Sequence, residues 1–169
     1  MAGHAALLAV VAVMVVACSN PPSPTAGVSL SPSPAPAASS ASFPNGGCGN
    51  TPIHKGGIPA WATENAPASL PYVVATPDIA MGYLFTDPLR TGQDMNKILW
   101  YVRAPRDGST LTAEGHPLGS SGPIARFSSL DNSGPGEIYP SGPSVPTAGC
   151  WHFTLSWHGN VATVDLLFE

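Results

Sequence analysis

The side chains best suited to acid–base or metal chemistry are His116, His152 and Asp165, in the second half of the chain. They are far apart in the sequence, so they can act together only if the fold brings them into one cleft. His152 and Asp165 fall on one face of the predicted C-terminal strands, where they can form a surface ion pair or a weak metal site. Solvated polar residues on an outer sheet face are the simpler interpretation, and we favour it.

Catalytic and metal-binding motifs are missing from the sequence. The histidines lack the H-x-x-x-H and H-E-x-x-H spacings, no two cysteines are spaced for zinc, and no serine lies in a G-x-S-x-G elbow. We therefore predict no catalytic, cofactor-binding or metal-ligating residues, no bound cofactor and no enzyme activity. A small hydrolase or metal-dependent enzyme built on His116, His152 and Asp165 is the alternative.

Composition narrows the class of protein. Only 9% of residues are charged, the net charge is −4, and proline and glycine number 20 and 18. This much proline and glycine excludes a helical bundle or a coiled coil. The six scattered Lys and Arg residues offer no basic patch for phosphates, so we predict no nucleic-acid partner.

The N-terminal segment has the features of an export signal. Residues 5–17 form an unbroken apolar run, which as a helix rises about 20 Å, short of the roughly 30 Å hydrocarbon core of a membrane. That length is typical of the apolar region of a signal peptide, which we assign to residues 1–17.

Residues 15–18 (Val-Val-Ala-Cys) resemble the lipobox of bacterial lipoproteins. The resemblance implies cleavage before Cys18 and lipidation, with palmitate among the acyl chains, that anchors the chain extracytoplasmically to the cell membrane. Residues 1–4 depart from the pattern because they contain no Lys or Arg. An ordinary cleaved secretion signal and an uncleaved anchor are the alternatives.

A tether is predicted to follow the lipidated cysteine. Residues 19–47 hold seven prolines, eight serines and no charged side chain, too little apolar surface to repay the entropy of ordering. We assign residues 18–47 to the lipidated Cys18 and a disordered or partly polyproline II spacer. Ligands for recognition domains and O-glycosylation sites are the alternative interpretations of this composition.

Residues 48–169 are predicted to form a single all-β domain. Strands rich in β-formers are expected between Pro and Gly turns at residues 72–76, 79–86, 96–103, 109–114 and 124–130. Residues 59–64 are the one plausible helical turn. Several short strands closed by a hairpin predict a β-sandwich.

The C-terminal hairpin carries the strongest local pattern. Residues 151–157 and 161–168 alternate apolar with polar side chains, and a two-residue turn at Gly159 and Asn160 sets apolar residues opposite one another. The predicted pairs are Trp157–Ala162, Leu155–Val164, Phe153–Leu166 and Trp151–Phe168. The residues predicted to face outward are His152, Thr154, Ser156, His158, Thr163 and Asp165.

The remaining cysteines suit an oxidising compartment. With Cys18 lipidated, Cys48 and Cys150 are left as one pair, which we predict to form a disulfide. Two free buried thiols are the alternative. The bridge would tie the end of the tether to the start of the C-terminal hairpin.

Residues 140–151, with residues 97–100 and 111–118, resemble a group of uncharacterised secreted lipoproteins from actinobacteria and related bacteria. The specific part is the Pro-Thr-x-Gly-Cys-Trp run at residues 146–151. The resemblance covers residues 50–169 and implies an immunoglobulin-like sandwich, and it brings no catalytic residues. Residues 115–138 depart from the group's pattern.

These features predict a membrane-anchored lipoprotein that displays a binding or scaffolding module. The expected partners are the membrane, through the lipid, and an envelope protein or glycan. Aromatic side chains are enriched at binding surfaces, so an exposed platform for sugar rings or peptide is one hypothesis. Its members would be Trp61, Tyr83, Tyr101 and Tyr139.

Overall fold

The computed structural model describes residues 42–62, 69–92, 96–103, 108–130 and 138–169. In these residues the chain forms ten strands and no helix. The predicted signal peptide, Cys18 and all but the last residues of the tether lie outside the described residues.

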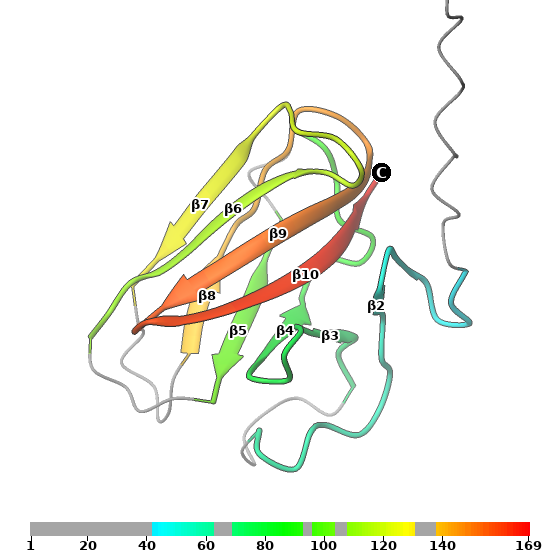
Figure 1. The fold of residues 1–169 in the computed structure, drawn as a ribbon. Coiled ribbons are helices and arrows are strands. Elements are labelled where there is room, and N and C mark those ends of the chain that lie inside the picture. The colour runs from blue at the N-terminus through cyan, green and yellow to red at the C-terminus, as the bar shows by residue number, and fades with distance from the viewer. Residues whose placement is uncertain (1–41, 63–68, 93–95, 104–107, 131–137) are drawn as a thin grey trace, which may run out of the picture. The chain divides into compact units, whose positions relative to one another are not determined.

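Two four-stranded antiparallel sheets face each other (Figure 1). The first sheet has the order β10-β9-β6-β7, with β6 at Leu111–Pro117, β7 at Ala125–Ser129, β9 at Gly149–Trp157 and β10 at Asn160–Phe168. The second has the order β3-β4-β5-β8, with β3 at Tyr72–Val74, β4 at Ala80–Leu84, β5 at Ile98–Val102 and β8 at Ile138–Ser141. A small hairpin of β1 (Gly47–Cys48) and β2 (Thr51–Pro52) precedes them.

The protein is therefore the all-β sandwich that the sequence predicts. The pairs β5–β8 and β6–β9 join strands that are not consecutive, so the chain crosses between the sheets. In the immunoglobulin scheme, β10-β9-β6-β7 takes the order of strands G, F, C and C′, and β4-β5-β8 that of A, B and E. The predicted strands all appear, and β6 extends to Pro117, beyond the expected end at residue 114.

The main core lies between the two sheets and depends on alternation along β9. Trp151, Phe153 and Leu155 are fully buried, and they belong to one apolar cluster with Trp100 of β5. Gly115 stands opposite Phe153 on β6, where a side chain would overlap the Phe153 ring. The absence of a side chain at this position leaves the volume that the ring fills.

The C-terminal hairpin forms with the predicted faces but in a different register. Trp157 pairs with Asn160, so the turn residues are His158 and Gly159 rather than Gly159 and Asn160. Their φ angles of 43° and 73° are those of a type I′ turn, which places glycine second and fits the twist of the strands. The predicted apolar pairs are wrong by two residues, and Leu155 lies opposite Ala162. A shift of two preserves which side chains are buried.

The outer face of the second sheet is covered. Residues 58–62 and 69–70 pack over Tyr72, Met81 and Tyr83 as a second apolar cluster. The predicted helical turn at residues 59–64 is here a single hydrogen-bonded turn, in which the Ala62 N–H donates to the Pro59 carbonyl over 2.9 Å. Residues 63–64 lie outside the described residues.

This cover shows that the aromatic platform hypothesis is wrong. Tyr83 and Tyr139 are fully buried, and Trp61 and Tyr101 are partly buried in or against the second cluster. The Trp61 Nε1–H donates to Asp78 Oδ1 over 3.0 Å. Tyr83 and Tyr101 are covered because the chain before β3, which includes Trp61, folds back over the sheet, and Tyr139 lies in the main core between the sheets. Local sequence patterns reveal neither arrangement.

The predicted bridge between Cys48 and Cys150 is present, with Cα atoms 5.8 Å apart. It joins β1 to the first residues of β9 across 102 positions of sequence.

A double Cys48→Ser, Cys150→Ser variant should lose about 2–5 kcal/mol of unfolding free energy, because a long loop in the unfolded chain is no longer constrained. Urea unfolding of the oxidised protein and the variant measures this difference. Equal midpoints would show that the bridge adds no stability.

Tyr83 provides a second test, of the covered face. Its hydroxyl is buried without a hydrogen-bond partner among the described residues, and burial, with smaller contributions from Tyr101 and Tyr72, raises its pKa to about 12. The unfolded chain therefore releases this proton first, so stability falls between pH 10 and pH 12 by up to about 1.4 kcal/mol per pH unit.

Replacing Tyr83 by Phe should remove both effects. We expect Tyr83→Phe to gain about 1 kcal/mol at pH 7, because an unpaired buried hydroxyl is lost, and to flatten the alkaline decline. Chemical unfolding at pH 7 and at pH 11 measures both. Parallel pH dependence of the variant and the wild type would show that Tyr83 is not the responsible group.

Candidate functional site

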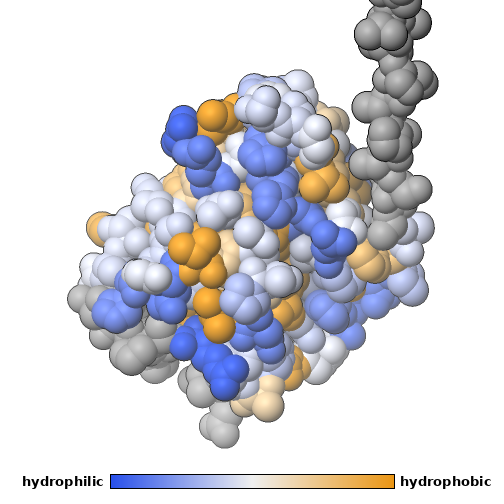
Figure 2. All heavy atoms as spheres, in the orientation of Figure 1, coloured by the Kyte–Doolittle hydropathy of each residue, from blue (hydrophilic) through white to orange (hydrophobic). Residues whose placement is uncertain are grey.

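The open outer face of the first sheet carries three rows of polar side chains. The rows run across the strands because residues paired in register point to the same side. From one end of the face to the other they are Ser128–Thr112–Ser156, Arg126–Glu114–Thr154–Thr163 and His116–His152–Asp165. Figure 2 shows this face of the molecule, on which hydrophilic and neutral side chains prevail over scattered hydrophobic ones.

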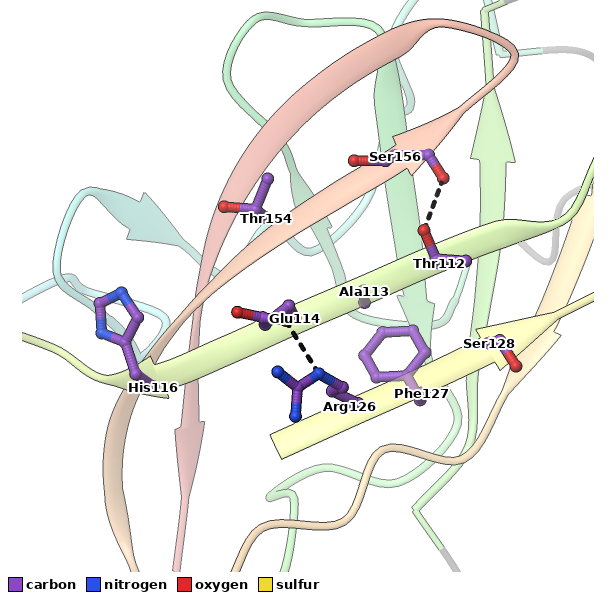
Figure 3. A pocket seen from close by; sticks show the side chains of 9 residues that line it. All are labelled: Thr112, Ala113, Glu114, His116, Arg126, Phe127, Ser128, Thr154 and Ser156. Carbon is purple, nitrogen blue, oxygen red and sulfur yellow. Dashed lines mark hydrogen bonds and ion pairs between the residues drawn. The ribbon is translucent and has the colours of Figure 1, made fainter. Parts of the chain in front are cut away.

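A hollow of about 780 Å³ lies on this face (Figure 3). Side chains of β6, β7 and β9 line it, and most of them end in a hydroxyl, carboxylate, guanidinium or imidazole group. The β6 alternation, with Leu111, Ala113 and Gly115 inward, turns Thr112, Glu114 and His116 outward. The hollow is therefore a by-product of the same pattern that builds the core.

Charge in the hollow is paired. Arg126 Nε lies 2.8 Å from Glu114 Oε2, and both side chains are more than half exposed. An exposed pair of this kind contributes little to stability, and both groups can turn toward a ligand at small cost. The Thr112 hydroxyl donates to the Ser156 carbonyl over 3.4 Å.

At one end of the same face, His152 and Asp165 form a close pair. His152 Nδ1 lies 2.6 Å from Asp165 Oδ1. The register predicted from the sequence would leave His152 and Asp165 diagonal to each other, whereas the observed register sets them directly opposite on β9 and β10. The pairing of His152 with Asp165 that the sequence raised as a hypothesis is therefore present in the structure as a close hydrogen-bond contact.

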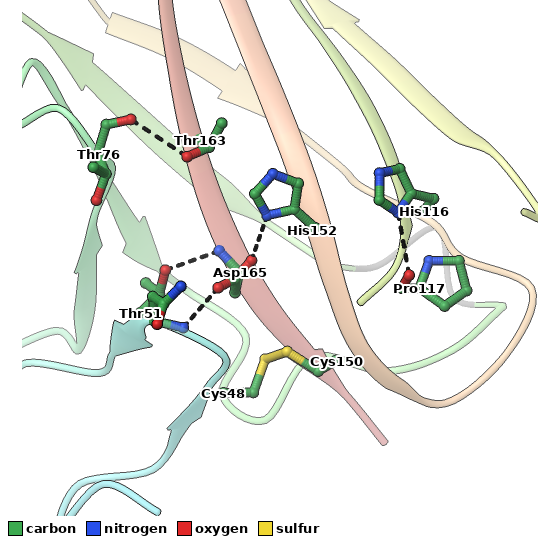
Figure 4. Close-up of polar contacts among 10 residues, drawn as sticks. Cys48, Thr51, Thr76, His116, Pro117, Cys150, His152, Thr163 and Asp165 are labelled. Atoms are coloured by element: carbon green, nitrogen blue, oxygen red, sulfur yellow. Dashed lines mark hydrogen bonds and ion pairs between the residues drawn. A yellow bond between two sulfur atoms is a disulfide. The ribbon is translucent and has the colours of Figure 1, made fainter. Parts of the chain in front are cut away.

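The expectation that Asp165 is a solvated residue on the outer face is wrong, because its side chain is only 4% exposed. Alternation puts it on the outer face as predicted, but the β1–β2 hairpin covers it there. Asn50 N–H donates to Asp165 Oδ2 over 2.7 Å, and Asp165 N–H donates to the Thr51 hydroxyl over 2.8 Å. Gly49 has no side chain where one would overlap the carboxylate. Figure 4 shows these contacts beside the disulfide.

His116 completes the third row. Its ring centre lies 5.7 Å from that of His152, and its Nδ1 lies 3.1 Å from the carbonyl oxygen of Pro117. The fold thus brings together all three residues on which the enzyme alternative depends. His158 lies in the hairpin turn and His54 stacks on Tyr72, away from this row.

Sequence reasoning missed Thr112, Glu114, Arg126 and Ser128 as members of the site. All four lie in segments predicted as strands from weaker patterns. The alternation at residues 111–115 predicts that Glu114 faces outward. It does not show that β6 pairs with the distant strand β9 as well as with its sequence neighbour β7.

The described residues contain no helix long and apolar enough to cross a membrane. They also contain no group of three or more His, Cys, Asp or Glu side chains placed to hold a metal ion.

Comparison with known proteins gives one distant likeness. No family model matches the chain, and no curated protein matches it. Among solved structures, the X-ray structure of a "Putative Lipoprotein from Bacillus anthracis" is similar, with 16% identity and a TM-score of 0.44. The match covers 67% of this chain and 97% of the other. A likeness this distant carries no argument about function.

The buried carboxylate can be tested by replacing it with its amide. Asp165→Asn should lower the unfolding free energy by about 1–3 kcal/mol, because the amide has a single acceptor oxygen and cannot accept from both the His152 ring and the Asn50 N–H. Chemical unfolding measures the loss, and the imidazole proton resonances of His152 should shift. Thr163→Ala, on the same face of β10, should change stability by no more than about 0.5 kcal/mol. Equal effects of the two changes would contradict a special role for Asp165.

Proposed function

We propose that this protein is a lipoprotein held at the outer surface of the cell membrane through Cys18, and that its sandwich domain binds a glycan of the cell envelope. The observation that carries the binding proposal is the hollow on the outer face of β6, β7 and β9. The anchor rests on the resemblance of residues 15–18 to a lipobox and on the apolar run before them. A proline- and serine-rich stretch between anchor and domain fits a spacer.

The two outer sheet faces differ in a way that favours the first sheet as the binding surface. Residues 58–62 and 69–70 cover the outer face of the second sheet and pack against its aromatic side chains Tyr72, Tyr83 and Tyr101. The first sheet leaves its central strands, β6 and β9, open over most of their length and covers only the end near Asp165. A ligand can therefore lie across the first sheet without displacing any described segment.

The chemistry of the hollow favours a glycan over a protein partner. The cores of protein interfaces are enriched in aromatic and apolar side chains and depleted of charge. Hydroxyl groups of Thr112, Thr154 and Ser156, together with Arg126 and Glu114, instead offer donors and acceptors in rows. Such an arrangement suits a ligand that carries many hydroxyl groups.

A hydrolase is the second candidate, and the His152–Asp165 pair is the observation that favours it. A carboxylate that holds a histidine in this way is one part of a nucleophile–base–acid arrangement. In the described part of the chain, the pair lacks the hydroxyl or thiol hydrogen-bonded to the second ring nitrogen that such a mechanism needs. Binding is therefore the function that the geometry supports best.

The binding proposal is tested with the purified full chain and cell-envelope polysaccharide. Arg126→Ala should weaken binding at least about tenfold, because it removes a multidentate donor from the hollow. Lys97→Ala is the matched control, since Lys97 lies over the Phe85 ring, outside the hollow. Retention of full affinity by Arg126→Ala, or an equal loss in Lys97→Ala, would contradict the proposed site.

The anchor has its own test. Cys18→Ala should move the protein from the membrane fraction to the soluble fraction, because no acceptor for lipid remains at the lipobox position. Fractionation of cells that express each form measures this change. A Cys18→Ala protein that stays with the membrane would point to an uncleaved apolar anchor.

A further inference from the structure

The third row of the open face holds two imidazoles side by side. His116 on β6 and His152 on β9 pair in register, and both rings stand on the outer side of the sheet (Figure 4). The side chain of His152 is 32% exposed, and that of His116 is partly exposed. Solvent and small ions can therefore reach both rings.

Hydrogen bonding fixes the tautomer of both rings. The Pro117 carbonyl can only accept, so His116 Nδ1 must carry the proton in their 3.1 Å contact. The Asp165 carboxylate likewise accepts from His152 Nδ1 at 2.6 Å. In a neutral imidazole one nitrogen donates and the other holds a lone pair. Both Nε2 atoms are then left with lone pairs, and within the described residues neither has a hydrogen-bond partner.

This is the arrangement that surrounds histidine ligands in metal sites. A metal-bound histidine donates its other ring N–H to a carboxylate or a backbone carbonyl, which sets its orientation and its basicity. His152 has the carboxylate and His116 has the carbonyl. Asp165, buried and held by the Asn50 N–H, brings a negative charge beneath the pair that favours a bound cation.

The spacing of the two rings also fits. Two imidazoles bound through Nε2 to one tetrahedral zinc ion, at Zn–N distances near 2.0–2.1 Å, have ring centres about 5 Å apart. The ring centres of His116 and His152 are 5.7 Å apart, with planes inclined by 43°. The ring centres would have to approach by about 0.7 Å, and both side chains are partly exposed.

We propose that His116 and His152 bind one divalent transition-metal ion, Zn²⁺ or Cu²⁺, through their Nε2 atoms. Imidazole suits both ions. Asp165 acts as a positioning residue, through the His152 ring. The described residues offer only these two side chains as ligands, so the site is open, and water or a group of a ligand in the adjoining hollow completes the coordination. The proposal is independent of the glycan, because metal binding is measured with the ion alone.

The experiment titrates the purified full chain with Zn²⁺ and, separately, with Cu²⁺, and follows heat by calorimetry and the imidazole nitrogens by NMR. We expect one ion per chain, with shifts of the Nε2 resonances of His116 and His152 under Zn²⁺ and paramagnetic broadening of the same resonances under Cu²⁺, both reversed by a chelator. His116→Ala and His152→Ala should each weaken binding at least about tenfold, and Asp165→Asn about 10–100-fold.

His158→Asn is the matched control. It removes an exposed imidazole from the hairpin turn, and Asn tolerates the positive φ of that position. It should leave the affinity unchanged. An unfolding curve of each variant, measured without metal, shows whether that variant is folded. If Asp165→Asn does not fold, His116→Ala still tests the proposal, because His116 is partly exposed. Unchanged affinity of both folded histidine variants, or an equal loss in His158→Asn, would overturn the proposal.

Discussion

Strand β9 alternates large apolar side chains with small polar ones, and the rest of the domain depends on that alternation. Trp151, Phe153 and Leu155 must be removed from water, so the second sheet has to lie on their side. The same geometry leaves His152 and Thr154 on the opposite side. The candidate site therefore owes its position to the core, and a shift of β9 by one residue would abolish both.

The two outer faces of the sandwich differ in how much of each is covered by other parts of the chain. This difference decides which face a ligand can reach. On the second sheet, residues 58–62 and 69–70 make a second apolar cluster with Tyr72 and Tyr83. On the first sheet, the N-terminal hairpin covers only Asp165 and leaves the hollow beside it open. This partial cover buries the Asp165 carboxylate beside imidazoles that solvent can reach, a contrast that neither a fully open nor a fully covered face would provide.

The sequence predicted what local alternation and elimination can predict. These patterns predicted β3 to β7, β9 and β10, the sandwich, the faces of the C-terminal hairpin and the pairing of Cys48 with Cys150, but not the short strands β1 and β2 or the strand β8. Sequence reasoning failed where distant segments meet. The alternation along the strand correctly places Asp165 on the outer face, but no local pattern shows that Asn50 and Thr51 will cover it. Tyr83 and Tyr139 were candidates for an exposed platform, but Tyr83 lies under the chain before β3 and Tyr139 lies in the core between the sheets.

The hairpin register shows a finer limit of the same kind. Two turns, at Gly159–Asn160 and at His158–Gly159, bury the same side chains, so the hydrophobic pattern does not distinguish them. The backbone makes the choice, because a type I′ turn accepts His158 in the left-handed region with glycine after it. The chosen register sets His152 directly opposite Asp165 and so creates the close pair.

The disulfide also determines how the domain carries mechanical load. The strands β1 and β2 are two residues each, and their few hydrogen bonds would separate readily under tension. Cys48 instead passes a pull on the preceding chain covalently to Cys150, at the start of the nine-residue strand β9. That strand is hydrogen-bonded on both sides, to β6 and β10, and it also presents His152, Thr154 and Ser156. With the proposed anchor at the N-terminus and the proposed ligand on the open face, tension would travel along β9 and bypass the short strands β1 and β2.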